Sequence, residues 1–312
     1  MGRKTKADPT GQLTNRDKSA KALRKQLFRA EGRIKKVFLN IGWQSRRQVK
    51  VVNEQTTVYD YNISEAELDA LRVTIQRILN HEVMQTQLET PPQDWYYREN
   101  IELSHRQGAL EEVRDFNGLV AGAIAAGVLI NGLPPRTLEP QSILFSQRYR
   151  ESLSTAYIDN FRSIKGMSDK TAADVMRAIK TGIRAGRKPS DVATGITNRF
   201  NVSKASAERI ARTEINKAYT DAKMETSKVM AQQTGLRAGV IHISALTDTT
   251  RSEHAARHGN AYTVEDQQEW WDKGANRINC KCTVESVLID DSGKVVDAKK
   301  QEEIKEERSF FS

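Results

Sequence analysis

The sequence contains little cysteine, and this scarcity excludes a disulfide scaffold. Cys280 and Cys282 are the only cysteines among the 312 residues, and a single residue separates them. Two cysteines this close cannot form an ordinary structural disulfide, because on a strand their side chains run parallel and the ring would be too tight. A reducing compartment is therefore the expected environment of the chain.

Long apolar runs and the motifs of common enzymes are missing as well. The longest apolar stretch, residues 118–130, has thirteen residues, whereas a membrane-spanning helix needs about 20. The sequence has no GxxxxGK phosphate loop, no GxGxxG and no GxSxG, which argues against the common NTPase, dinucleotide-binding and hydrolase classes. We expect the apolar stretch to pack as a buried helix.

Positive charge, in contrast, is concentrated in the first fifty residues. Residues 1–50 hold fifteen Lys or Arg against three acidic residues, a net +12, so the overall net charge of +9 leaves −3 for the other 262 residues. A basic arm on a near-neutral body indicates a polyanionic partner, with nucleic acid first and a membrane surface second. A solubilising tail is the alternative interpretation.

The arm is predicted to contain an amphipathic helix. Residues 1–15 fit a disordered lead-in, and from Asp17 to about Asn40 the apolar residues Leu23, Leu27 and Ile34 recur at helical spacing. Lys and Arg occupy the other face of this helix. The candidate DNA-binding residues are Lys18, Lys21, Arg24, Lys25, Arg29, Arg33, Lys35 and Lys36.

Helical periodicity dominates the chain up to residue 237 and predicts a body of long helices. Helices are expected from Ser64, as N-cap, to about Leu88, over 94–130 with a break near 118–122, and over 139–163. Residues 168–200 predict a helical hairpin with Ser168 and Ser190 as N-caps, and 204–233 predict a long helix. Residues 49–63 are β-prone and fit either a short ribbon or an irregular loop.

The last third of the sequence predicts a small α+β module. Strands over 238–246 and 278–290 are expected to pair, with short helical segments over 250–259 and 264–274 between them. The fold class is thus mainly α: a long-helix body with a basic N-terminal arm and a small C-terminal α+β module. The predicted domains are 1–50 (arm), 51–165 (helical body), 166–237 (hairpin and long helix), 238–290 (α+β module) and 291–312 (charged tail).

The module contains residues that suit a metal. His254 and His258 are four apart and share one face of a helix, whereas Cys280 and Cys282 project from one face of a strand. If the helix packs on the strand pair, the four side chains converge as a tetrahedral set, and thiolate with imidazole favours zinc. Four protein ligands leave no open position for substrate, so such a zinc would be structural. The alternative is that the histidines form local hydrogen bonds and the cysteines are small buried hydrophobes.

Catalytic interpretations of the same stretch have less support. The zincin metalloprotease helix needs a glutamate after its first histidine, and Ala255 stands there. Asp248, Arg251 and His254 could serve as acid, phosphate clamp and base of a nuclease, although no spacing rule supports that trio. An N-cap by Asp248, supported by Thr250, is the favoured interpretation.

The order of these motifs resembles the phage head morphogenesis, or minor head, proteins of the Mu F-like family. The pattern is an "ARTE" helix, a strand, then Asp, Thr, Arg and His, a Gly, and an Asn-Cys-x-Cys ending, over roughly residues 165–290. Its positions here are Arg212, Thr213, Glu214, Asn216, Asp248, Thr250, Arg251, His254, Gly259, Asn279, Cys280 and Cys282. Lys281 replaces the usual arginine between the cysteines, and the prolines often found before them are missing.

The resemblance implies a minor virion protein that is not an established enzyme. Its implied place is the capsid interior near the portal, with the host cytoplasm as the site of assembly. Its expected partners are the portal protein, major capsid or scaffold proteins, and double-stranded DNA, to which the basic arm would bind through phosphates without reading sequence. A third interpretation, after the nuclease, is a membrane-active ejected protein that uses residues 118–130 and the basic helix.

Overall fold

The computed structural model describes residues 5, 7–41, 45–51, 54–93, 95 and 97–310. The helices are α1 (Leu13–Asn40), α2 (Glu65–Leu79), α3 (Arg98–Ala125), α4 (Pro140–Leu144), α5 (Gln147–Arg184), α6 (Pro189–Thr234), α7 (Ser252–Arg257), α8 (Val264–Asp272) and α9 (Ala298–Glu306), with a π-helix at Asn80–Met84 and a 3-10 turn at Glu307–Phe310. The strands are β1 (Ser45–Val51), β2 (Glu54–Asp60), β3 (Ala238–Ile243), β4 (Ala261–Tyr262) and β5 (Thr283–Leu288). The predicted fold class, mainly α with a small α+β module, is confirmed.

The chain divides into two compact units. One comprises residues 1–17, 97–159 and 211–312, and the other comprises residues 18–96 and 160–210. Helices α1, α5 and α6 each contribute residues to both units. We describe the units separately, as the helical unit (18–96 and 160–210) and the module unit (the remainder).

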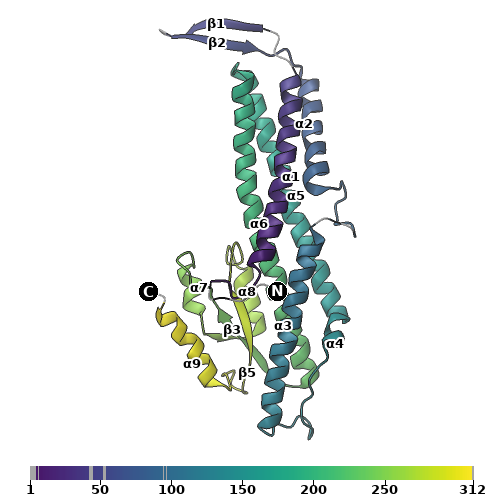
Figure 1. The fold of residues 1–312 in the computed structure, drawn as a ribbon, viewed down its shortest axis with the longest axis vertical. Coiled ribbons are helices and arrows are strands. Elements are labelled where there is room, and N and C mark those ends of the chain that lie inside the picture. Colours follow the sequence, from purple (N-terminus) through teal and green to yellow (C-terminus); the bar gives the residue numbers. More distant parts are fainter. Residues whose placement is uncertain are drawn as a thin grey trace. The chain divides into compact units, whose positions relative to one another are not determined.

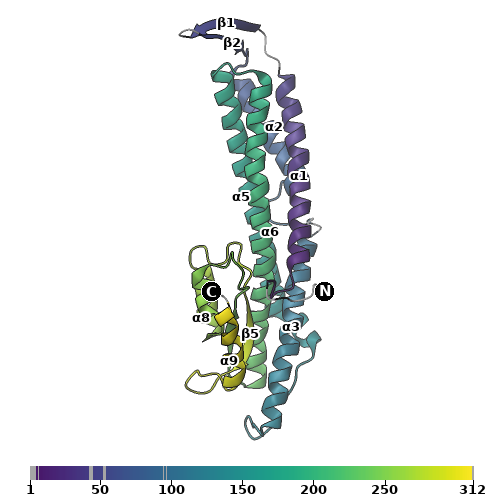
Figure 2. The ribbon, with the colours of Figure 1, turned by 60° about the vertical axis from the view of Figure 1, so that its left-hand side comes forward.

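The helical unit is held together by apolar faces of α1, α2, α5 and α6, which run side by side (Figures 1 and 2). Leu27, Ile34, Ile75, Ile179 and Phe200 are completely buried in it. The predicted start of α2 is confirmed, because the Ser64 hydroxyl accepts a hydrogen bond from the Glu67 amide in a capping box. The β-prone segment is an antiparallel hairpin of β1 and β2.

Several predicted helix breaks are absent. Helix α3 continues through residues 118–122, α5 through Ser168, and α6 from Pro189 to Thr234 without a stop near 201–204. Ser168 is fully buried inside α5 rather than at an N-cap. Local serine and glycine signals are weak priors that burial of a continuous apolar face overrides. No helix among the described residues is both long and apolar enough to cross a membrane.

The lead-in to α1 differs from its prediction. Asp8, Thr10 and Gln12 are buried, and the Gln12 side-chain amide donates to Gln107 Oε1 at 2.8 Å and accepts from Ser104 Oγ at 2.7 Å. These contacts fix the segment on α3, so the prediction of a disordered lead-in is wrong for residues 7–15. The basic residues Arg3, Lys4 and Lys6 lie outside the described residues.

In the module unit, α3 and α6 approach closely enough to require glycine. A Cβ on Gly108 would lie 2.2 Å from the Tyr219 carbonyl oxygen, whereas Gly118 and Gly122 have nothing within 4 Å of that position. The close approach of the two helices is therefore at Gly108, whereas most of residues 118–130, which we expected to pack as a buried helix, are exposed.

Beside this contact lies a buried charge cluster. Lys223 of α6 is 1% exposed, and its Nζ lies 3.0 Å from Glu111, 3.6 Å from Glu112 and 3.2 Å from Asp115 on α3. Glu112 is completely buried and accepts a hydrogen bond from the Ser286 hydroxyl on β5. The cluster thus joins both helices to the sheet.

The sheet has the strand order β4-β3-β5, and all pairs are antiparallel. The predicted pairing of the two long strands is confirmed by a register that sets Val240 opposite Ser286 and Ile243 opposite Thr283. The cysteines come just before β5 rather than within it. Helices α7, α8 and α9 lie around this sheet (Figure 1).

Candidate metal centre

Three separate segments of the module bring histidine and cysteine side chains together. His242 comes from the C-terminal end of β3, His254 from α7, and Cys280 and Cys282 from the loop ahead of β5. All four residues are buried. One potential ligand atom from each of His242, His254 and Cys282 lies within 4.8 Å of the other two.

His254 faces both sulfurs. Its Nδ1 lies 3.4 Å from Cys282 Sγ and 3.5 Å from Cys280 Sγ. The Cys282 backbone amide donates to Cys280 Sγ at 3.3 Å, a contact that favours a negatively charged sulfur. A hydrogen bond from Cys282 lowers the pKa of the Cys280 thiol well below its usual range, and the same contact raises the pKa of Cys282. Cys280 therefore loses its proton more readily than an isolated thiol does, and Cys282 loses its proton less readily.

His242 presents an unused nitrogen. Its Nδ1 donates to the Gln267 side-chain oxygen at 3.2 Å, which leaves the lone pair on Nε2, and Nε2 is buried without a hydrogen-bond partner among the described residues. Burial, and then the positive charge of Arg257, lower the pKa of His242 to about 3. The ring is therefore neutral near pH 7, the form that can bind a metal.

His258, which the sequence placed among the ligands, is engaged elsewhere. The Ser244 backbone amide donates to its Nδ1 at 3.0 Å, and its Nε2 donates to the Ile304 carbonyl oxygen at 2.9 Å. Both ring nitrogens are thus used to join β3 to α9. The structure brings together three of the four predicted ligands, and His242 lies beside them where His258 was expected.

The residues ahead of α7 have structural contacts of their own. Arg251 donates to the carbonyl oxygens of Ala275 at 2.7 Å and Asn276 at 2.8 Å, so its guanidinium holds the loop that leads to the cysteines. Arg251, and not Asp248, is the N-cap residue of α7, without a side-chain cap, and Asp248 is exposed. The predicted Asp248 cap is therefore wrong, whereas the role of Arg251 as the phosphate clamp of a nuclease trio stays a prediction.

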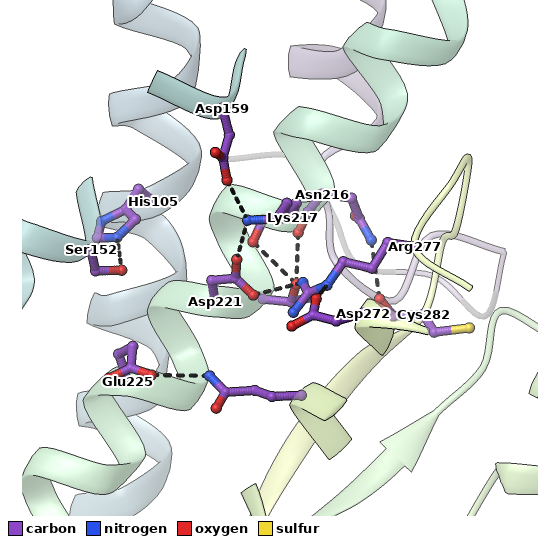
Figure 3. A network of polar contacts seen from close by, with 12 residues as sticks. His105, Ser152, Asp159, Asn216, Lys217, Asp221, Glu225, Asp272, Arg277 and Cys282 are labelled. Carbon is purple, nitrogen blue, oxygen red and sulfur yellow. Dashed lines mark hydrogen bonds and ion pairs between the residues drawn. The ribbon is translucent and has the colours of Figure 1, made fainter. Parts of the chain in front are cut away.

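The "ARTE" helix also forms hydrogen bonds to the loop that contains the cysteines. Asn216 Nδ2 donates to the Cys282 carbonyl oxygen at 3.1 Å (Figure 3), and Thr213 Oγ1 accepts from the Asn279 amide at 2.9 Å. Asn279 has a positive φ of 55°, a conformation that asparagine tolerates better than most residues. These contacts explain why motifs about 65 residues apart occur together: they form one packed unit.

A second polar site lies beside this unit, and the sequence did not single it out. Lys217 contacts Asp159 at 3.0 Å and Asp221 at 2.9 Å, and Arg277 contacts Asp221 at 2.6 Å and Asp272 at 3.0 Å (Figure 3). Lys217, Asp221, Asp272 and Arg277 line a cavity of about 540 Å³. Only the four-residue spacing of Lys217 and Asp221 could have indicated part of the network, because its other members come from distant segments. Every charge in it is paired, which gives it the character of a structural joint.

Comparison with known proteins agrees with the motif order. Residues 173–285 match the family described as Phage Mu protein F like protein, a range that includes the "ARTE" helix, His242, His254 and both cysteines. No curated protein and no solved structure matches the chain. Over residues 173–285, the chain is therefore similar to the Mu F-like family of phage head morphogenesis proteins.

Proposed function

We propose that this protein is a minor head protein of the virion that holds packaged double-stranded DNA through an exposed row of basic side chains on α1. The match of residues 173–285 to the Mu F-like family supports the head-related role. The observation that carries the DNA-binding role is the basic row itself, which we call the basic stripe.

The basic stripe consists of Lys18, Lys21, Lys25, Arg29 and Lys36. All five are exposed, and within the described part of the chain none forms an ion pair. Their spacings of three, four, four and seven residues put them on one face of the helix, over a length of about 27 Å at 1.5 Å per residue. An array of this kind suits a run of DNA phosphates and carries no base readout.

Three of the basic residues predicted to bind DNA have partners within the helical unit. Arg24 pairs with Glu208 at 2.7 Å, Arg33 with Glu82 at 2.5 Å, and Lys35 with Glu31 at 3.4 Å. A paired cation offers less net charge to a phosphate. We therefore assign the DNA contacts to the basic stripe in place of the eight residues suggested by sequence.

The location and partners of the protein belong to the same proposal. A DNA-holding minor head protein would lie inside the capsid near the portal after assembly in the host cytoplasm, with the portal protein and the major capsid or scaffold proteins as neighbours. The Mu F-like domain supports this assignment. Co-purification of the tagged chain with the portal protein tests it, and capture of capsid protein alone would contradict the portal part.

The proposed DNA binding is tested by its salt dependence. Five phosphate contacts predict a slope of about −4.5 in log affinity against log salt, or about a 500-fold loss between 50 and 200 mM. Changing Lys18, Lys21 and Lys25 to Ala should reduce the slope by about 2.7. Lys188→Ala is the matched control, because Lys188 is exposed in the same unit and lies outside the stripe. Equal slopes for wild type and the triple variant would contradict the proposal.

We also propose a structural zinc ion at the His/Cys cluster, which would link β3, α7 and the cysteine loop. The buried soft ligands and the unpartnered ring nitrogens support it. Such an ion would raise the melting temperature, and a strong chelator should lower it. An unchanged melting temperature after verified metal removal would contradict the structural role.

A further inference from the structure

We infer that the two imidazole ligands of this zinc site are His242 and His254, with Cys280 and Cys282 as the two thiolates. The inference rests on the proposed zinc and adds the identity of the ligands, in particular that His242 on β3 takes the role sequence gave to His258. It follows from the distances between ligand atoms, the unused nitrogen of His242 and the charge balance.

The distances around His254 agree with a tetrahedral zinc. With zinc–sulfur near 2.3 Å and zinc–nitrogen near 2.0–2.1 Å, a nitrogen and a sulfur on one zinc are separated by about 3.5 Å. The two observed separations from His254 Nδ1 are 3.4 Å to Cys282 Sγ and 3.5 Å to Cys280 Sγ. Both nitrogen–sulfur separations are therefore already close to their metal-bound values.

The fourth ligand should be the histidine that has a ring nitrogen without a hydrogen-bond partner. His242 Nε2 is buried and unpartnered, and the ligand atoms of His242, His254 and Cys282 lie within 4.8 Å of one another. His258 has a hydrogen-bond partner on each ring nitrogen, so binding through it would break a bond to Ser244 or Ile304. A metal at the His242 position breaks none.

The surroundings of His242 match those of a metal-bound imidazole. The Gln267 side-chain oxygen accepts from Nδ1 and fixes the orientation of the ring, as an outer-shell partner of a ligating histidine does. The rings of Trp270 and Trp271 lie 5.4 and 5.7 Å from the imidazole, centre to centre. This packing restricts rotation of the ring and keeps Nε2 directed toward the cluster.

Charge also favours the assignment. Two thiolates, two neutral imidazoles and Zn²⁺ sum to zero, so the filled site carries no uncompensated charge in a buried place. Zinc binding would release the thiol protons.

A small polar cavity adjoins the cluster within the module unit. Its volume is about 60 Å³, and it is lined by Thr247, Thr250 and Arg251 together with His254, Cys280 and Cys282. The cavity has room for water beside the ligand atoms.

The test is zinc content of the purified full chain, expressed with added zinc, for wild type and two variants. His242→Phe removes the ligand nitrogen and keeps an aromatic ring between the tryptophans, whereas His258→Gln keeps a donor and an acceptor. We expect about one zinc per chain in wild type and in His258→Gln, and loss of at least about nine tenths of it in His242→Phe. Circular dichroism of each variant checks that the helices remain.

Each outcome is decisive. Zinc-free but folded wild type would overturn the zinc proposal, and with it the ligand assignment, while the DNA-binding proposal would stand. Zinc in wild type that persists in His242→Phe, or that disappears in His258→Gln, would overturn His242 alone.

X-ray absorption at the zinc edge covers the case in which His242→Phe does not fold. The chain has five histidines, and His105 already contacts Ser152 in another part of the module unit. If the spectrum of His258→Gln shows two imidazoles and two sulfurs around zinc, the imidazole beside His254 is that of His242. A single imidazole in that spectrum would overturn the assignment.

Discussion

Replacement of Lys223 by Met should destabilise the protein strongly, and more at pH 7 than at pH 5. Lys223 is buried and faces Glu111, Glu112 and Asp115 at 3.0, 3.6 and 3.2 Å. At an effective dielectric constant of 20, one unit-charge pair at this separation is worth about 4–5 kcal/mol. Breaking a buried pair by removing one partner costs about 3–5 kcal/mol, because a charge is left buried without compensation.

The pH dependence follows from Glu112. Burial raises its pKa, and the neighbouring Lys223 counteracts that rise. Without Lys223 the pKa of Glu112 rises further, so the folded variant binds a proton that the unfolded chain releases at pH 7. Folding then becomes more favourable as the pH falls toward the ordinary pKa of glutamate, and the loss of stability shrinks.

Urea unfolding followed by far-ultraviolet circular dichroism at both pH values measures the effect. Lys228→Met is the control, because Lys228 is partly exposed and its pairs with Glu225 and Glu265 are 3.2 and 3.4 Å long, which predicts a loss of at most about 1 kcal/mol. A loss below about 1 kcal/mol for Lys223→Met, or an equal loss at both pH values, would show that the buried charges around Lys223 do not control stability as predicted.

Three smaller perturbations test other parts of the fold. Gly108→Ala should lower the free energy of unfolding by about 1–3 kcal/mol, because the new methyl group overlaps the Tyr219 carbonyl. Gly118→Ala lies in open space on the same helix and should raise the free energy of unfolding by up to about 1 kcal/mol. Melting temperatures that move in the same direction would contradict this. Ser64→Ala should cost about 1 kcal/mol through loss of the capping box, and an unchanged urea midpoint would count against it. Burial lowers the pKa of His105 to about 4, so the folded protein should lose about 3 kcal/mol of unfolding free energy through this group as the pH falls from above 6.5 to 4. His105→Gln should therefore make the free energy of unfolding less dependent on pH in the acid range. An unchanged pH dependence would show that His105 is not responsible.

The local signals of the sequence predicted the elements well and their ends less well. Ser64, followed by Glu67, identified the start of α2, and alternation identified the two long strands of the sheet. The break expected at Ser168 is absent, because the apolar face of α5 continues into the core on both sides of it. Capping residues predict an end only where burial does not favour a longer helix.

At the metal centre too, the sequence identified some residues of the cluster and missed another. Spacing identified His254, Cys280 and Cys282, but gave preference to His258 because it shares a helix face with His254. His242 lies in a buried strand, where nothing local distinguishes a ligand from a core residue. Its part in the cluster depends on antiparallel pairing that places β3 beside the cysteine loop, and one-dimensional spacing does not contain that information.

The most direct test of the proposed role is the salt dependence of DNA binding by a variant with all five stripe residues, Lys18, Lys21, Lys25, Arg29 and Lys36, changed to Gln. The core residues Leu23, Leu27, Ile34 and Phe38 of α1 are buried, so substitution is a cleaner test than deletion of the arm. We expect the log–log slope to fall in magnitude by about 4.5 relative to wild type, with the helix content unchanged. A folded variant that binds duplex DNA with the wild-type affinity and slope would contradict it.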